Sequence, residues 1–226
     1  MSEEIATPVE TQPPGLWTRA CQGEMDCLAT FVPQFWLPVY AWLRSVGDSA
    51  EAAPRHCGDF LSHIAASRPP AGDDISAARL REHVLGKLRE FLASGFPASP
   101  SPVAVDGEKG EQLIANADGK TEDDIFHQRW ALRLLEMAII ALRSEYEAQQ
   151  KAALFTAMKP FLSFSPDEKG YSSVAKDLGM SGSAFHMQVF AFRKRYRALL
   201  RGLIADTVRH PDDVDSELTA LLVAAS

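Results

Sequence analysis

Apolar residues in this chain recur every three or four positions over long stretches, and this spacing constrains the fold more than any other feature. The clearest case is 121–150, where Phe126 and Trp130 begin an apolar face that continues to the end of the segment. Thr121 with Asp124 three residues later resembles a capping box at its start. No stretch alternates apolar and polar residues as a half-buried strand does. We therefore expect an all-α fold.

Shorter segments show the same helical spacing. The other expected helices are 16–46, 59–66, 76–94, 152–162 and 211–224. Pro33 and Pro38 should break or kink the first of them, because proline lacks the backbone N–H that a helix interior uses. Ser76 is the expected N-cap of 76–94, and Pro211 is expected at the first position of the last helix.

Composition divides the chain into four parts. Residues 1–15 are acidic and proline-rich and are expected to form a disordered tail. Residues 16–95 form one predicted helical domain, and 121–226 form a second. The segment 96–120 between them is rich in Pro, Gly, Ser and Ala without a helical period, so we interpret it as a flexible linker.

Charge is spread unevenly along the chain. Residues 1–125 hold 10 basic and 19 acidic side chains, for a net charge of −9, whereas 126–226 hold 13 and 11, for +2. Because nucleic-acid affinity depends on cationic surface, any DNA binding is expected in the second half. The sequence has no secretory signal, no membrane-length apolar run and only three cysteines, so we expect a cytoplasmic protein with reduced thiols.

Residues 171–201 have the pattern of a helix-turn-helix. Ser172 is expected to cap a short first helix, which Gly179 ends by taking a left-handed conformation. Ser181 or Ser183 is expected to cap a longer second helix, which has five cationic residues between Arg193 and 201. Two short helices joined at a glycine also occur in plain helical bundles, so the pattern predicts a DNA reader without excluding a simpler structural role.

The second helix has two dissimilar faces. Its expected inward stripe is Phe185, Val189, Phe192, Tyr196, Leu199 and Leu203. The candidate base-contacting residues on the other side are Ser181, Ser183, His186, Met187, Gln188 and Phe190. The candidate phosphate contacts are Arg193, Lys194, Arg197 and Arg201. Met187 and Phe190 suit a thymine methyl group, although exposed apolar side chains more often mark a protein interface.

Three segments resemble the sigma factors of bacterial RNA polymerase, specifically the small two-domain, extracytoplasmic-function type. They are FVPQFWLPVYAWLRSVGDSAEA (31–52), RWALRLLEMAIIALRSEYEAQQKAALFTAMKPFL (129–162), and YSSVAKDLGMS followed by RKRYRALLRGLIADTV. The resemblance covers most of the chain outside the tail and linker. It implies a protein without catalytic chemistry or cofactor that binds core RNA polymerase and promoter DNA. The first domain would dock on the polymerase and open the −10 element, and the second would read the −35 element in the major groove.

The chain departs from this family in the segments that carry those activities. In the stretch that corresponds to the polymerase-contacting patch, 54–60, only Asp59 and Phe60 resemble it, and these two are the expected polymerase contacts. The third helix ends in Ser-Gly-Phe-Pro at 94–97, with no cation before Lys109, where the family carries a basic, aromatic, promoter-melting segment. An alternative function is therefore a sigma-derived protein-interaction or regulatory module that has lost promoter melting. An anti-sigma or other regulatory protein is a further partner that the resemblance allows.

A metal-dependent enzyme is the third hypothesis that the residues permit. The candidate ligands are Cys21, Cys27, His56, Cys57 and His63. Their spacing lacks the short Cys-x-x-Cys knuckle of structural zinc sites, so we expect no metal.

Overall fold

The computed structural model describes residues 14–24, 26–69, 78–114, 119–162 and 168–226, and this part of the chain is helical without a β-strand. In chain order the α-helices are α1 (Leu16–Cys21), α2 (Asp26–Phe31), α3 (Trp36–Ser45), α4 (Ala53–Ala66), α5 (Leu80–Ala93), α6 (Gly107–Ile114), α7 (Glu122–Ala148), α8 (Ala152–Met158), α9 (Glu168–Asp177), α10 (Gly182–Ala205) and α11 (Val214–Ala225). Short 3-10 turns occupy η1 (Val32–Phe35), η3 (Lys159–Leu162) and η4 (Pro211–Asp213). The all-α prediction is confirmed.

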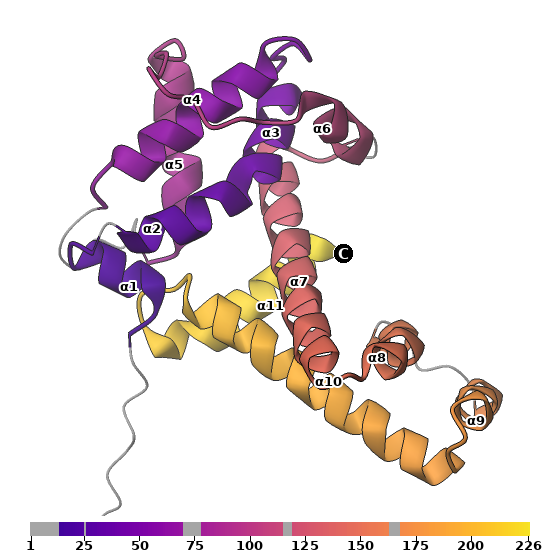
Figure 1. Cartoon of the computed structure of the whole chain (residues 1–226). Coiled ribbons are helices and arrows are strands. Elements are labelled where there is room, and N and C mark those ends of the chain that lie inside the picture. Colours follow the sequence, from indigo (N-terminus) through magenta and orange to yellow (C-terminus); the bar gives the residue numbers. More distant parts are fainter. Residues whose placement is uncertain (1–13, 25, 70–77, 115–118, 163–167) are drawn as a thin grey trace, which may run out of the picture.

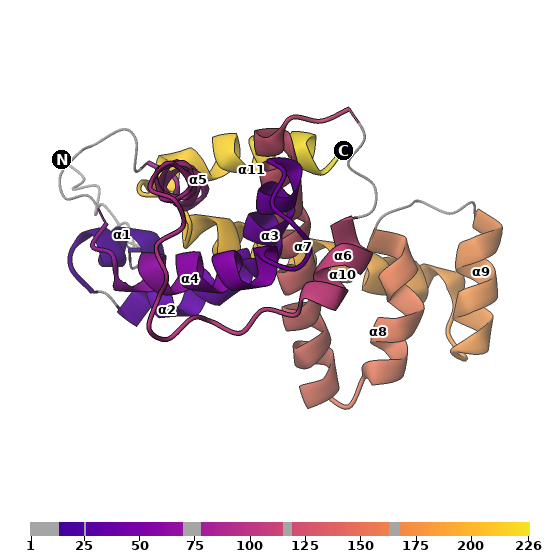
Figure 2. The same cartoon turned by 90° about the horizontal axis from the view of Figure 1, so that it is seen from above.

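Helix α7 is the central element, as its periodicity predicts (Figures 1 and 2). The side chain of Thr121 accepts a hydrogen bond from Asp124 N, and the Asp124 carboxylate accepts one from Thr121 N, which completes the expected capping box. Phe126 and Trp130 are fully buried. The Phe35 ring stacks on Trp130 with centroids 3.9 Å apart, which fixes α7 against the N-terminal helices.

The described residues form two hydrophobic cores, and α7 and α10 run through both. The main core takes buried residues from α1 to α5, the first part of α7, the end of α10 and α11. The distal core takes them from the end of α7, α8, η3, α9 and the beginning of α10. Because the main core draws on both sides of the predicted linker, the division into two domains remains a prediction that this packing does not favour.

The segment expected as a linker, 96–120, contains a helix. Asp106 accepts a hydrogen bond from Lys109 N at the start of α6, and Gly110 lies against the Tyr40 ring, where a Cβ atom would come within 2.5 Å of a ring carbon. Glu111 accepts hydrogen bonds from Tyr40 Oη and Arg44 Nε at 2.9 and 2.6 Å. The expectation of a helix-free linker was therefore wrong for 107–114, because contacts with α3 hold a segment whose glycines disfavour a helix.

Other helix limits differ from expectation for local reasons. Helix α4 begins at Ala53 instead of 59, with a proline in its first turn, where no helical N–H is lost. Pro33 lies in η1, which separates α2 from α3, as expected. Pro38 lies in the first turn of α3, which continues past it, and the break after α1 falls at the left-handed Gly23. The expected cap Ser76 lies outside the described residues. Ser172 lies inside α9, which begins at Glu168, so its predicted role as a cap was wrong.

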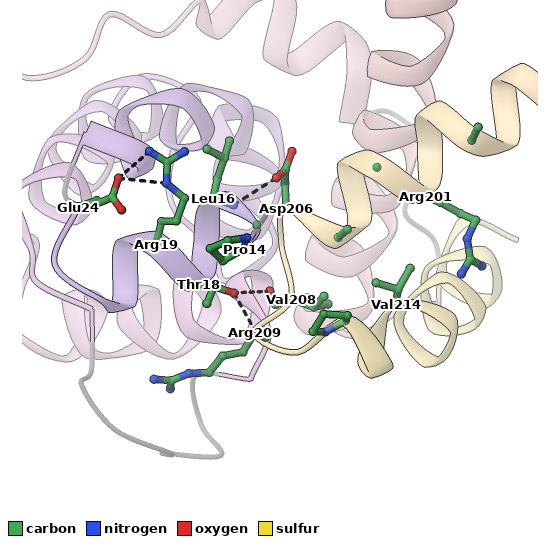
Figure 3. Close-up of a pocket in the computed structure, with 15 residues that line it drawn as sticks. Pro14, Leu16, Thr18, Arg19, Glu24, Arg201, Asp206, Val208, Arg209 and Val214 are labelled. Carbon is green, nitrogen blue, oxygen red and sulfur yellow. Dashed lines mark hydrogen bonds and ion pairs between the residues drawn. The ribbon is translucent and has the colours of Figure 1, made fainter. Parts of the chain in front are cut away.

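The turn after α10, residues 206–209, ties the C-terminal half to the N-terminal helices (Figure 3). Trp17 N donates to Asp206 O at 2.9 Å, and Thr18 Oγ1 donates to Arg209 O at 2.9 Å. On the other side of the turn, Leu80 N donates to Thr207 O at 2.9 Å. The start of α1 and the start of α5 are thus both fixed to one short segment of backbone.

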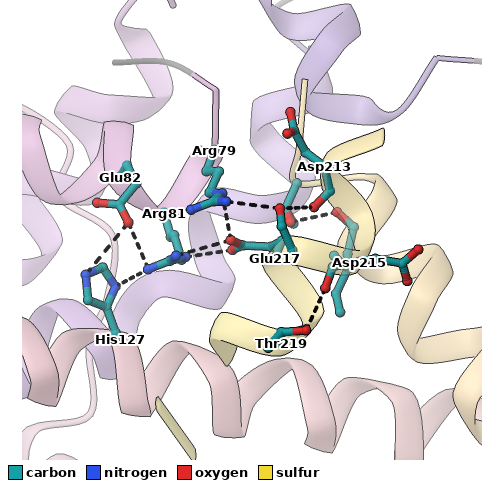
Figure 4. Close-up of polar contacts among 11 residues, drawn as sticks. Arg79, Arg81, Glu82, His127, Asp213, Asp215, Glu217 and Thr219 are labelled. Carbon is teal, nitrogen blue, oxygen red and sulfur yellow. Dashed lines mark hydrogen bonds and ion pairs between the residues drawn. The ribbon is translucent and has the colours of Figure 1, made fainter. Parts of the chain in front are cut away.

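A buried ion-pair network reinforces this joint (Figure 4). Glu217 of α11 is only 1% exposed, and its two carboxylate oxygens accept from Arg81 Nε at 2.6 Å and Nη2 at 3.1 Å. Arg79 Nε lies 3.0 Å from the same carboxylate. Arg81 Nη1 also donates to His127 Nδ1 at 2.9 Å, and burial together with the Arg81 charge lowers the pKa of His127. The network joins α5, α7 and α11.

Candidate nucleic-acid interface

The turn between α9 and α10 is built by Gly179 and Ser181. At the end of α9, Gly179 N donates to Lys176 O and Met180 N donates to Ala175 O, the paired hydrogen bonds of a Schellman motif. Gly179 has a φ of +66°, in the left-handed region that favours glycine. Ser181 Oγ then accepts from Ala184 N at 3.2 Å and caps α10. Both predicted turn residues are confirmed.

Aromatic packing in the distal core fixes the orientation of α10. Phe185 and Phe192 are fully buried on its inner face. Phe161 lies edge-on to Phe185 with centroids 5.3 Å apart, and Phe155 lies edge-on to Phe192 at 5.7 Å. Such contacts are directional, so they restrict rotation of the helix about its axis. The outer face of α10 is therefore presented in a defined orientation.

Most of the candidate base-contacting residues lie together on this outer face. Ser183, Met187 and Phe190 are exposed there, and Met187 and Phe190 keep 68% and 65% of their surface in solvent. Gln188 is also exposed, but it lies about 100° around the helix from Met187. His186 is also exposed but stacks on Tyr171 of α9, with ring centroids 4.0 Å apart. Ser181 Oγ is engaged as the cap, so its hydroxyl is the least free of the set.

The four candidate phosphate contacts do not behave alike. Lys194 and Arg197 are exposed, and the described residues provide no ion-pair partner for either. Arg193 Nε donates to Phe161 O at 2.8 Å, so its guanidinium is held against the body of the protein. Arg201 forms an ion pair with Asp215 of α11. Two of the four side chains, Arg193 and Arg201, therefore already have intramolecular partners, and phosphate contact by the four residues stays a prediction.

The fifth cation of the cluster, Arg195, points toward α7. Its Nε donates to Glu145 Oε2 at 2.8 Å. This hydrogen bond raises the pKa of Arg195 and lowers the pKa of Glu145. Because the Glu145 charge offsets that of Arg195, Lys194 and Arg197 dominate the electrostatic character of the outer face.

The two expected polymerase contacts are buried. Asp59 is 1% exposed, accepts from Ser99 N at 2.8 Å and pairs with Arg55 at 3.5 Å. Phe60 is fully buried against Phe91 of α5. Neither side chain can reach a partner in this conformation. The resemblance to sigma factors indicates where these two residues lie in the chain. Their exposure depends on the segment after α5, which includes Ser99 and packs over α4.

Phe96, an apolar residue three positions after the end of α5, is partly buried. It has a φ of +57°, which is uncommon for a side chain with a Cβ atom, and its ring stacks on His56 with centroids 4.1 Å apart. The end of α5 is thus folded back onto α4 instead of being presented as an extended segment.

A hollow of about 1070 Å³ lies beside the 206–209 joint (Figure 3). Its polar side chains include Arg19 and Asp206, which are already paired with Glu24 and with Leu16 N. Burial raises the pKa of Asp206. The lining brings together no nucleophile with a base, so the hollow has no arrangement that predicts catalysis.

The cysteines carry no metal site in the part of the chain that the structure describes. Cys21, Cys27 and Cys57 are free thiols, and no group of three or more potential ligands lies together among the described residues. Burial raises the pKa of the Cys57 thiol, which donates weakly to Trp36 O. Among these same residues, no helix is both long enough and apolar enough to cross a membrane.

The buried network of Arg79, Arg81, His127 and Glu217 was not predicted from the sequence. Arg81 and Glu217 are 136 positions apart, and neither lies in a motif. No local signal distinguishes a buried pair of this kind from surface charges.

Comparisons with models of known protein families, with curated proteins and with solved structures found no match.

Proposed function

We propose that this chain is a sigma-like transcription initiation factor that binds core RNA polymerase in the cytoplasm and directs it to promoter DNA. The observation that carries the proposal is the α9–α10 pair. Its turn is framed by Gly179 and Ser181, and its outer face presents Met187, Phe190 and Lys194 in an orientation fixed by aromatic packing. The resemblance of 31–52, 129–162 and the reader segment to sigma factors supports it.

In this proposal α9 and α10 act as a helix-turn-helix. The first turns of α10 enter the major groove, where Ser183 and Gln188 offer hydrogen bonds to base edges. Lys194 and Arg197 lie farther along the same face and contact phosphates. Arg193 and Arg201 act through the protein instead, by holding α10 to η3 and to α11.

The N-terminal helices supply the polymerase-binding part of the proposal. Because Asp59 and Phe60 are buried, contact falls to exposed residues nearby, such as Glu51 just before α4 and Arg55 in its first turn. This differs from the family pattern, so polymerase binding is the part of the proposal that most needs a direct test.

The test is co-purification of the tagged full-length chain with core RNA polymerase from the same cell. We expect a stoichiometric complex with core polymerase that survives washing at moderate salt. An Arg55→Ala, Glu51→Ala variant should reduce recovery, whereas Val223→Ala, at an exposed site on α11, serves as the matched control. Absence of core polymerase from the wild-type eluate would contradict the proposal.

A second candidate is a sigma-derived module that binds polymerase or another protein but does not melt promoters. The burial of Asp59 and Phe60 and the folded-back, cation-free end of α5 at 94–97 favour it. Permanganate reactivity of thymines in the −10 region separates the two. Reactivity that depends on this protein supports the initiation factor, and polymerase recruitment without such reactivity supports the module.

A further inference from the structure

Two large apolar side chains stand on the outer face of α10, and no described residue covers them. Met187 and Phe190 are 68% and 65% exposed, whereas Phe185, Val189 and Phe192 on the opposite face are buried. The distal core is complete without the two exposed side chains. Two large apolar side chains left in water forgo the free energy that their burial would release, so their position calls for a partner surface.

The charge of α10 indicates the chemistry of that partner. Helix α10 carries five Lys or Arg residues and no Asp or Glu. Lys194 follows Phe190 by four residues and Arg197 by seven, which places both cations on the same face as the apolar pair. A partner that meets this face must be anionic along its edge and must offer an apolar group beside the charge.

Double-stranded DNA has this combination in its major groove. Its phosphates flank the groove, and the 5-methyl of thymine is the apolar group that base edges present there. Residues three apart on a helix rise about 4.5 Å, compared with about 3.4 Å for one base-pair step. Met187 and Phe190 are therefore spaced to address neighbouring base pairs.

We propose that Met187 and Phe190 read the methyl groups of thymines on adjacent base pairs, and that this contact sets the sequence specificity of α10. The inference rests on the proposed function, because it names what the helix-turn-helix recognises. Ser183 adds a hydrogen bond beside the methyl contacts, and the Tyr171–His186 stack fixes the neighbouring position. The bound element contains at least one A·T pair at each methyl contact.

The test uses the purified full-length chain and duplexes selected from random-sequence DNA by this chain. In the best-bound duplex, each thymine is replaced in turn by deoxyuridine, which removes only the methyl group. Fluorescence anisotropy then measures the dissociation constant of each duplex. We expect a loss of affinity of roughly three- to tenfold at one or two thymines and no change at the others.

Side-chain variants link those thymines to the two residues. Met187→Ala and Phe190→Ala should each abolish the difference between thymine and deoxyuridine at one position while binding the deoxyuridine duplex as the wild type does. Both side chains are exposed, so the fold should be retained, which circular dichroism checks. Val223→Ala removes an exposed apolar side chain on α11 and should preserve the discrimination.

The possible outcomes distinguish a failure of methyl reading from a failure of the proposed function. Salt-dependent binding with no effect of deoxyuridine at any position overturns methyl reading and leaves the proposed function intact. Methyl discrimination that persists in both variants also overturns the inference. If the variants bind DNA normally but lose core polymerase in the co-purification, the apolar pair is a protein-binding surface. Failure to select any DNA overturns promoter reading, and the inference with it.

Discussion

Replacing Glu217 with alanine tests the buried joint between the N-terminal helices and α11. The substitution removes the buried carboxylate that accepts two hydrogen bonds from Arg81, which is 7% exposed, and leaves the partly exposed Glu82 as its remaining ion partner. It also removes the ion-pair partner of Arg79. Breaking a buried ion pair in this way costs about 3–5 kcal/mol of unfolding free energy. In a chain of this size, where each kcal/mol is worth roughly 2–4 °C, the melting temperature should fall by roughly 6–20 °C.

Urea unfolding followed by circular dichroism at constant pH measures this change. Asp215→Ala is the matched control, since it removes a carboxylate from the same helix that forms only an exposed pair with Arg201. The control should cost no more than about 1 kcal/mol. The double variant Arg81→Met, Glu217→Leu should recover most of the lost stability, because apolar replacement of a whole buried pair is often nearly neutral. A Glu217→Ala variant within about 1 kcal/mol of the wild type would refute the assigned burial of the network.

Three further predictions follow from individual contacts. Lys194→Ala with Arg197→Ala should weaken DNA binding evenly across sequences and flatten the slope of log K against log salt by about two units, measured by anisotropy; an unchanged slope would contradict their role. Ser181→Ala removes the cap of α10 and should lower the unfolding free energy by about 1 kcal/mol in a urea titration, whereas Ser172→Ala, inside α9, should not. Burial lowers the pKa of His83 to about 4 from 6.5, so the unfolded chain takes up this proton first and stability should fall as the pH drops between these values. His83→Gln should flatten that part of the stability curve, and parallel curves for the two proteins would count against the assignment.

Features that depend on a few neighbouring residues could be predicted from the sequence. The capping box of Thr121 and Asp124 and the cap at Ser181 are local, because each side chain bonds backbone three residues away. The left-handed turn at Gly179 is local as well, because it depends on the missing Cβ atom of glycine. The inward stripe of α10 follows from helical periodicity, and Phe185 and Phe192 are buried as expected.

Features that depend on distant contacts could not be predicted. The hydrogen bond that holds the Arg193 guanidinium against the protein requires the carbonyl of Phe161. The pairing of Arg81 with Glu217 spans 136 positions. Helix α6 contains two glycines that disfavour a helix, yet Gly110 is needed where the Tyr40 ring approaches. The burial of Asp59 likewise depends on Ser99, beyond the end of α5. In each case tertiary contacts override the local preference.

Run-off transcription on genomic DNA, with core RNA polymerase from the same cell, tests the central claim most directly. Reactions with and without the full-length chain are compared, and the 5′ ends of the transcripts are mapped. The account predicts new transcripts that start downstream of a shared element and that are lost when Lys194 and Arg197 are replaced by alanine. If core polymerase binds the chain yet yields the same transcripts with and without it, the claim that this protein initiates transcription is contradicted.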